Sequence, residues 1–135
     1  MSVIKPFRAL RPVPEKAEQV SCVPYDVISV DEARELIEQN HLSFLRVTRP
    51  EADSGGAGSS AEQVNAAARE QLEQLIADGV FITEVEPSVY VYRLDTGTHS
   101  QTGIVACCSL DEYADGKIKR HEKTRPDKVE DRTNH

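Results

Sequence analysis

The sequence predicts an α+β fold made of a small mixed sheet and two main helices. Two observations lead to this prediction: two long stretches repeat apolar residues with the period of a helix, and several short apolar runs are separated by turn residues. Strands and helices in this order are typical of the α+β class. The length of 135 residues predicts a single domain over residues 1–135, large enough to bury a hydrophobic core.

The two helices are predicted from their apolar stripes and from the signals at their ends. The first follows Ser29, which stands three residues before Glu32 as in a capping box, and it runs to about Gln39. The second covers residues 61–78, where apolar side chains recur on one face, and Gly79 supplies its C-terminal stop.

The predicted strands are short apolar runs at residues 3–10, 20–23, 43–48, 88–95 and 101–110. Pro6 cannot donate to a sheet ladder, so the first run is expected at a sheet edge. The turn that contains Gly97 predicts that the last two runs form a hairpin. Residues 51–60 are rich in glycine and serine, which favours a flexible loop.

The net charge of -7 argues against a general affinity for nucleic acid or for an anionic membrane, and direct binding of either is not expected. The charge is unevenly distributed. Residues 117–135, the basic segment, hold seven Lys/Arg against four Asp/Glu, so the segment carries +3 and the other 116 residues carry -10. A cationic patch on an acidic body is better suited to a small anionic ligand than to a polyanion.

The three cysteines are Cys22, Cys107 and Cys108, an odd number without a CxxC pair. This arrangement argues against a disulfide framework and against a zinc site, and it predicts buried, reduced thiols in a cytoplasmic protein. Cys107 and Cys108 lie in an apolar strand, so nucleophilic cysteine chemistry is not expected. The N-terminal residues contain no long apolar run, which excludes a signal peptide or a membrane span there.

The basic segment combines the residue types that phosphate chemistry requires. The cations that can bind phosphate oxygens are Arg120, Lys123, Arg125, Lys128 and Arg132. His121, Glu122 and His135 are the candidates for catalytic proton transfer, and Glu122 with Asp131 can hold a magnesium ion. Pro126 predicts the first turn of a terminal helix, whose N-terminus attracts anions. Composition alone favours a different interpretation, a solvated helix face without a ligand.

Other catalytic motifs are absent from the sequence. There is no Walker-type phosphate loop, no GxGxxG, no HExxH and no GxSxG. The glycine-rich residues 55–58 lack the lysine of a phosphate loop. Whether the protein is an enzyme is therefore left open by its motifs.

The chain resembles the family known as domain of unknown function 1015. The matching stretches are residues 120–128 (RHEKTRPDK) with Asp131, Arg132 and His135, residues 4–12, 24–27, 43–45, 49–51 and 90–93. The resemblance implies that the chain is the N-terminal piece of a longer protein. The family is similar to the ParB/sulfiredoxin superfamily, which implies a small α+β domain that binds nucleotide phosphates at the start of a helix. Its genes often lie near serine-biosynthesis genes, which implies phosphoserine as a substrate.

Two functions are consistent with these features. The first is a phosphotransferase or phosphatase that acts on a small phosphorylated metabolite, with Tyr25, Asp26 and Arg49 as further substrate-binding candidates. The second is a non-catalytic nucleotide-binding regulatory module similar to the partition proteins. A nucleotide and Mg²⁺ are the cofactors that either function would use, and residues beyond His135 can contribute to the site. The sequence does not distinguish these functions or predict the oligomeric state.

Overall fold

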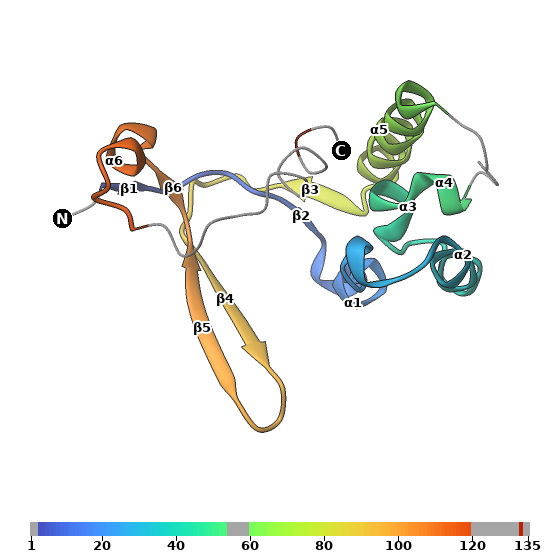
Figure 1. The fold of residues 1–135 in the computed structure, drawn as a ribbon, viewed down its shortest axis with the longest axis horizontal. Coiled ribbons are helices and arrows are strands. Elements are labelled where there is room, and N and C mark those ends of the chain that lie inside the picture. The colour runs from blue at the N-terminus through green and yellow to red at the C-terminus, as the bar shows by residue number, and fades with distance from the viewer. Residues whose placement is uncertain (1–2, 54–59, 120–132, 134–135) are drawn as a thin grey trace. The chain divides into compact units, whose positions relative to one another are not determined.

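The computed structural model describes residues 3–53, 60–119 and 133. Within them two short strands are followed by a run of helices, four further strands and the helix α6, which confirms the mixture of helices and strands predicted from the sequence (Figure 1). The chain divides into two compact units. Leu10–Ile82 form one of them, here called the helical unit, and Met1–Ala9 with Thr83–His135 form the other, here called the hairpin unit.

The helical unit carries most of the helices in the part of the chain that is described. Its elements are β2 (Leu10–Pro12), η1 (Pro14–Lys16), α1 (Ala17–Val20), η2 (Tyr25–Val27), α2 (Val30–Gln39), α3 (Leu45–Thr48), α4 (Pro50–Asp53), α5 (Ala61–Ala77) and the start of β3 (Phe81–Thr83). β2 and β3 pair as a two-stranded sheet. The peptide N–H of Val13 donates to the carbonyl of Val80 at 2.9 Å, so the two ends of the unit lie side by side.

Both long helices begin with a capping box. In α2 the peptide N–H of Ser29 donates to Oε2 of Glu32 at 2.8 Å, and the N–H of Glu32 donates to Oγ of Ser29 at 3.3 Å. Ser60 and Gln63 make the same reciprocal pair at the start of α5. The predicted helices are confirmed, and Gly79, at a φ of 69°, follows the end of α5 as its stop signal predicts.

Two clusters of buried apolar side chains form the core of the helical unit. The first comprises Val20, Leu75, Val80 and Phe81, with Leu42, Phe44 and Val47 packed against it. The second comprises Ala33, Ile37, Leu45 and Ala52, with Ile28 and Val30 packed against it. The rings of Phe44 and Phe81 lie 5.7 Å apart, so α3 and β3 meet in the first cluster.

The prediction of strands at residues 20–23 and 43–48 is wrong. Val20 ends α1, and the second run forms the short helix α3. The helical turn explains the difference, because it directs Phe44 and Val47 to the first cluster and Leu45 to the second. Helix α4 (Pro50–Asp53) also takes up residues 51–53, the first three residues of the predicted loop. The rest of that predicted loop, residues 54–59, lies outside the described residues.

The hairpin unit is built from paired strands and one short helix. Its elements are β1 (Ile4–Lys5), β4 (Tyr90–Asp95), β5 (Ser100–Val105), β6 (Cys107–Cys108) and α6 (Leu110–Ala114). β1 pairs with β6 antiparallel, and β4 pairs with β5 antiparallel from Tyr90 opposite Val105 to Asp95 opposite Ser100. The predicted hairpin is confirmed, and its turn places Gly97 at a φ of 81°.

The expectation of one mixed sheet is wrong for the described residues. Their strands form three separate two-stranded sheets, β1–β6, β2–β3 and β4–β5. The physical reason is that the strands are short, from two to six residues, and each is hydrogen-bonded along one side only. A sheet of this size offers little surface on which a shared core can form.

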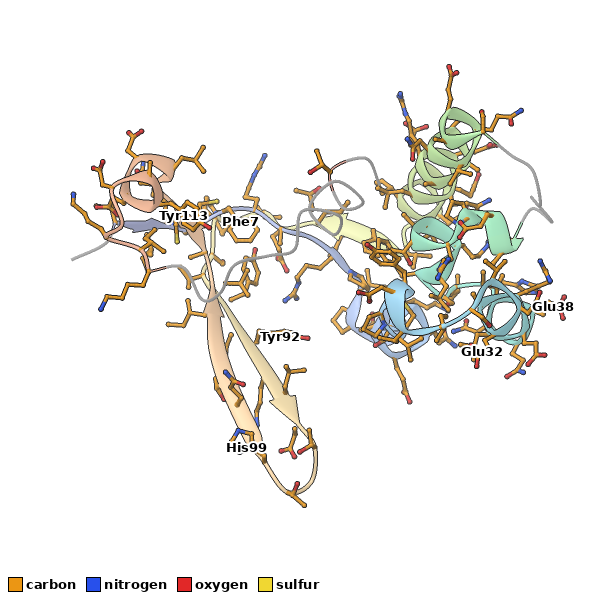
Figure 2. The ribbon with its side chains drawn as sticks, in the orientation of Figure 1. Phe7, Glu32, Glu38, Tyr92, His99 and Tyr113 are labelled. Carbon is orange, nitrogen blue, oxygen red and sulfur yellow. The ribbon has the colours of Figure 1, made fainter. Side chains whose placement is uncertain are left out.

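Most side chains of the β4–β5 hairpin are exposed, including those of Tyr92 and His99 (Figure 2). Tyr90 anchors its base. The phenol of Tyr90 donates to the carbonyl of Phe7 at 3.1 Å and accepts the N–H of Ala9 at 3.0 Å, and its ring lies 5.1 Å from that of Phe7. Tyr90 therefore packs at the base of the hairpin, whereas Tyr92 projects from the ribbon.

The prediction of buried thiols is also wrong. Cys22, Cys107 and Cys108 are all exposed free cysteines. They lie in β6, which pairs with β1 in a two-stranded sheet, or, for Cys22, just after α1. No helix in the described ranges has the length and apolar character needed to cross a membrane.

Candidate functional site

The residues predicted to bind phosphate or to catalyse its transfer lie outside the described residues. These are Arg120, His121, Glu122, Lys123, Arg125, Lys128, Asp131, Arg132 and His135, together with the predicted terminal helix. Their roles stay predictions. The structure does describe the start of the basic segment, residues 117–119, and the helix that precedes it.

Glu112 on α6 fixes the start of the basic segment. Glu112 as a whole residue is 9% exposed. Its carboxylate accepts a hydrogen bond from the N–H of Val3 at 2.8 Å and lies 3.9 Å from Nζ of Lys117. The backbone carbonyl of Glu112 accepts the N–H of Ile118 at 3.1 Å. One residue therefore ties the beginning of β1 to the beginning of the basic segment.

Sequence reasoning missed Glu112, although a local signal was present. Ser109 caps α6, because its hydroxyl accepts the N–H of Glu112 at 3.5 Å. The spacing Ser-x-x-Glu is that of a capping box, in which the glutamate returns to the cap residue. Here the Glu112 side chain reaches Val3 instead, a partner 109 positions away that no local pattern reveals.

Arg49 holds the turn η2 by a set of directional hydrogen bonds. Its Nε donates to the carbonyl of Tyr25 at 2.9 Å, and its Nη2 donates to the carbonyl of Ile28 at 2.8 Å. Its Nη1 lies 3.0 Å from Oε1 of Glu51, and the two side chains are 22% and 23% exposed. The structure thus brings together Arg49 and Tyr25, two of the three residues predicted from sequence to bind substrate.

The arrangement makes Arg49 a positioning residue for η2. A guanidinium that donates to two carbonyls and a carboxylate makes charge-assisted hydrogen bonds, which are stronger than neutral ones. Asp26, the third predicted substrate-binding residue, lies exposed in the turn that these bonds fix, next to half-buried Tyr25. The contact of these three residues with a substrate stays a prediction.

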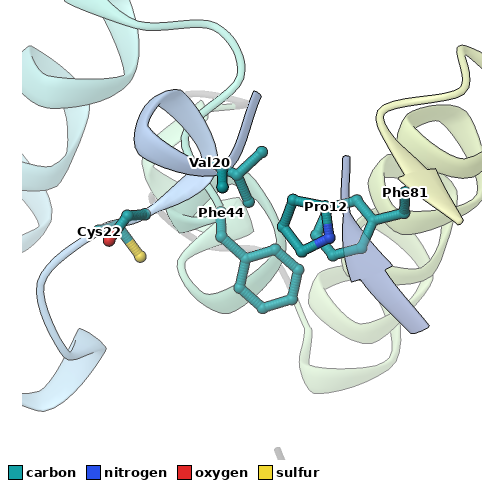
Figure 3. Close-up of a pocket in the computed structure, with 7 residues that line it drawn as sticks. Pro12, Val20, Cys22, Phe44 and Phe81 are labelled. Carbon is teal, nitrogen blue, oxygen red and sulfur yellow. The ribbon is translucent and has the colours of Figure 1, made fainter. Parts of the chain in front are cut away.

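The helical unit also has an apolar hollow of about 390 Å³ (Figure 3). It is lined by Pro12, Ala17, Val20, Ser21, Cys22, Phe44 and Phe81. No charged side chain lines it, so it cannot stabilise a phosphate group. Cys22 also lines a neighbouring hollow of about 230 Å³.

Burial raises the pKa of the Cys22 thiol above its ordinary value, and a hydrogen bond with the backbone of Leu45 opposes part of this effect. Cys22 as a residue is exposed and lines both hollows. A thiol with a raised pKa is a weaker nucleophile at neutral pH. Cys22 is therefore a wall residue with little nucleophilic character.

The residues predicted to hold a magnesium ion, Glu122 and Asp131, lie outside the described residues. Within residues 3–53, 60–119 and 133, no group of three or more His, Cys, Asp or Glu side chains is placed to hold a metal ion. Carboxylate oxygens are the ligands that Mg²⁺ prefers, so the chemistry of the predicted pair fits that ion.

The chain belongs to the family of proteins of unknown function DUF1015, whose model matches residues 4–135. No curated protein and no solved structure matches the chain. The family assignment predicted from the sequence motifs is confirmed, while the similarity to the ParB/sulfiredoxin superfamily stays a prediction.

Proposed function

We propose that this DUF1015 member binds a small phosphorylated ligand through its basic segment and transfers or hydrolyses the phosphoryl group. The observation that carries the proposal is the charge distribution. Residues 117–135 hold seven of the 16 Lys/Arg in the chain, while the other 116 residues have a net charge of -10. Such a contrast concentrates positive potential in one short stretch.

The size of the ligand follows from the same charges. A polyanion that reached the basic segment would also approach the acidic remainder of the chain and be repelled by it. The Debye length is about 8 Å at physiological ionic strength, so a small phosphorylated metabolite bound to the basic segment experiences mainly the nearby cations. Phosphoserine is the substrate suggested by the family resemblance.

Each side chain type in the segment has a defined role in this proposal. Arg120, Arg125 and Arg132 bind the phosphate oxygens through their bidentate guanidinium groups. His121 moves a proton to or from the reacting oxygen, and Glu122 orients the attacking hydroxyl or water. Phosphoryl transfer depends mainly on positioning and charge stabilisation, which such a set can supply.

The described residues support the proposal through the contacts of Glu112. The side-chain carboxylate of Glu112 accepts a hydrogen bond from Val3, and its backbone carbonyl accepts one from Ile118. The first residues of the basic segment are therefore held at α6 of the hairpin unit. Because the start of the basic segment is held in place, the segment loses less conformational entropy when it binds a ligand. Loss of the Glu112 side chain should therefore weaken ligand binding as well as stability.

A thermal-shift screen of the chain tests the proposal. The panel comprises nucleotides, phosphoserine, other phosphorylated metabolites and inorganic phosphate, each with and without Mg²⁺. A ligand present at about a hundredfold its Kd should add roughly 2.7 kcal/mol to the free energy of unfolding. The substitution Arg125→Ala should reduce this stabilisation to about 0.3 to 1.3 kcal/mol, because a charge-assisted contact contributes about 1.5 to 3 kcal/mol to binding.

The matched control is Arg69→Ala, which removes an exposed arginine from α5 in the helical unit. If Arg125→Ala and Arg69→Ala shift ligand binding equally, the assignment of the site to the basic segment is wrong. Turnover of the ligand, followed both as release of inorganic phosphate and as transfer of the phosphoryl group to an acceptor, then separates the functions. Binding without turnover would contradict the enzymatic proposal and favour the nucleotide-binding regulatory module.

A further inference from the structure

Cys107 and Cys108 are adjacent in β6 but face opposite sides of the β1–β6 ribbon. Successive side chains of a strand point to opposite faces, and residues directly opposite each other on paired strands share a face. Lys5 lies opposite Cys107, and Ile4 lies opposite Cys108. Cys107 therefore shares its face with a cation, and Cys108 shares its face with an apolar side chain.

A hollow of about 220 Å³ lies at the β1–β6 ribbon. Its lining residues are Val3, Lys5, Cys107, Cys108 and Ser109. Both cysteines are exposed and both line the hollow, so their surroundings differ through the register of the ribbon, which places Lys5 opposite Cys107 and Ile4 opposite Cys108.

Lys5 gives this hollow affinity for an anion. Side chains directly opposite on antiparallel strands have Cβ atoms roughly 4.5–5.5 Å apart, so the flexible lysine stem can bring Nζ beside Sγ of Cys107. The hydroxyl of Ser109 supplies a hydrogen-bond donor at the same hollow. Lys5 and Ser109 can thus bind the carboxylates of a reagent while the Cys107 thiol attacks the sulfur of that reagent.

We propose that Cys107 is a thiol-modification site that selects small disulfides bearing carboxylates. The Cys107 thiol loses its proton to solvent, and its sulfur attacks one sulfur of the disulfide. The disulfide bond of the reagent breaks, a mixed disulfide forms on Cys107, and the other half of the reagent leaves as a thiolate. The site uses no residue of the proposed phosphate-binding set and is independent of that function.

Rates of modification in single-cysteine variants test the proposal. Cys22→Ser is combined with Cys108→Ser or with Cys107→Ser, and each protein reacts with 5,5′-dithiobis(2-nitrobenzoate), which is anionic, and with 4,4′-dithiodipyridine, which is neutral. The ratio of the anionic to the neutral rate should be about fivefold higher at Cys107 than at Cys108, as one nearby unit charge predicts. About 1 M salt should remove this difference.

Lys5 variants identify the cause. Lys5→Met should abolish the preference at Cys107, Lys5→Arg should retain it, and Lys16→Met, a matched lysine in η1 of the helical unit, should leave it unchanged. The proposal is overturned if Lys5→Met keeps the preference or if Cys108 shows the same preference as Cys107. The salt titration needs no Lys5 substitution, so it remains decisive even if Lys5→Met unfolds the ribbon. Oxidised glutathione should likewise add faster to the variant that keeps only Cys107 than to the variant that keeps only Cys108, as measured by mass spectrometry.

Discussion

The two units of this chain are held together by different interactions. All buried hydrophobic residues of the described chain belong to the helical unit, where they form two clusters. In the hairpin unit, the buried residue among those described is a carboxylate, Glu112, and the remaining support comes from strand pairing and from Tyr90. Apolar burial is the main source of folding stability, and an isolated two-stranded hairpin is marginal in water.

This comparison teaches that local stability should differ between the units. Backbone amides protected by a packed core open only with global unfolding, whereas those supported by few contacts open locally. The helical unit should therefore show the slower hydrogen exchange. The predictions below test this difference, from the largest expected effect to the smallest.

Leu45→Ala should have the largest effect, because Leu45 is 0% exposed within the second cluster. Truncation of a buried leucine costs about 2 to 5 kcal/mol of the free energy of unfolding. The control is Leu94→Ala in the hairpin, where the side chain is 53% exposed and the cost should stay below about 0.5 kcal/mol. Urea denaturation followed by circular dichroism measures both, and equal costs would contradict the comparison.

Arg49→Ala should cost about 2 kcal/mol, because it removes the charge-assisted donors from the carbonyls of Tyr25 and Ile28. Arg49→Lys should recover little, since one ammonium cannot reproduce the forked geometry. Hydrogen exchange of residues 25–28 reports the loss directly. If these amides exchange equally slowly in wild type and in Arg49→Ala, Arg49 does not stabilise η2.

Tyr90→Phe should cost about 1 kcal/mol and act on the hairpin unit alone. The substitution keeps the ring contact with Phe7 but removes the hydrogen bonds to the carbonyl of Phe7 and from the N–H of Ala9. Amide exchange in β4 and β5 should accelerate while α2 and α5 keep their protection. Equal acceleration in both units would mean that they unfold as one.

Glu32→Gln should have the smallest effect, and that effect should depend on pH. The backbone N–H and the hydroxyl of Ser29 hydrogen-bond the Glu32 carboxylate and hold its pKa below the ordinary value. A lowered pKa in the folded state means that the stabilisation is present above the ordinary carboxyl pKa and is lost as pH falls through the lowered value. The difference in stability between wild type and Glu32→Gln should vanish in that acidic range. If wild type and Glu32→Gln still differ in stability at pH values below the lowered pKa, the Glu32 carboxylate does not stabilise the start of α2 in this way.

The sequence predicted those features whose signals are local. Ser29 with Glu32, the stop at Gly79 and the turn at Gly97 each depend on neighbouring residues, and each was found as expected. Leu45 shows the limit. The apolar residues at 43–48 are consistent with a strand as well as with a helix. The segment forms a helix, which places Leu45 in the second cluster.

The candidate site was predicted to a different extent. Tyr25 and Arg49 were both predicted as substrate-binding candidates, but the hydrogen bond between the Arg49 guanidinium and the Tyr25 carbonyl was not predicted. Glu112 was missed because its main partner, Val3, lies 109 positions away. Exposure of Cys107 and Cys108 was missed because an apolar strand sequence indicates burial only if something covers the strand.

The connection of Val3 with Glu112 has a consequence for the order in which the chain folds. The residues between them include the whole helical unit, whose own ends are already joined by the bond from Val13 to Val80. Formation of the helical unit therefore shortens the effective loop that β1 must close to meet β6, and so lowers the entropic cost of that step. During synthesis, β1 leaves the ribosome before the helical unit and β6 leaves after it, so β1 stays unpaired with β6 while the helical unit assembles.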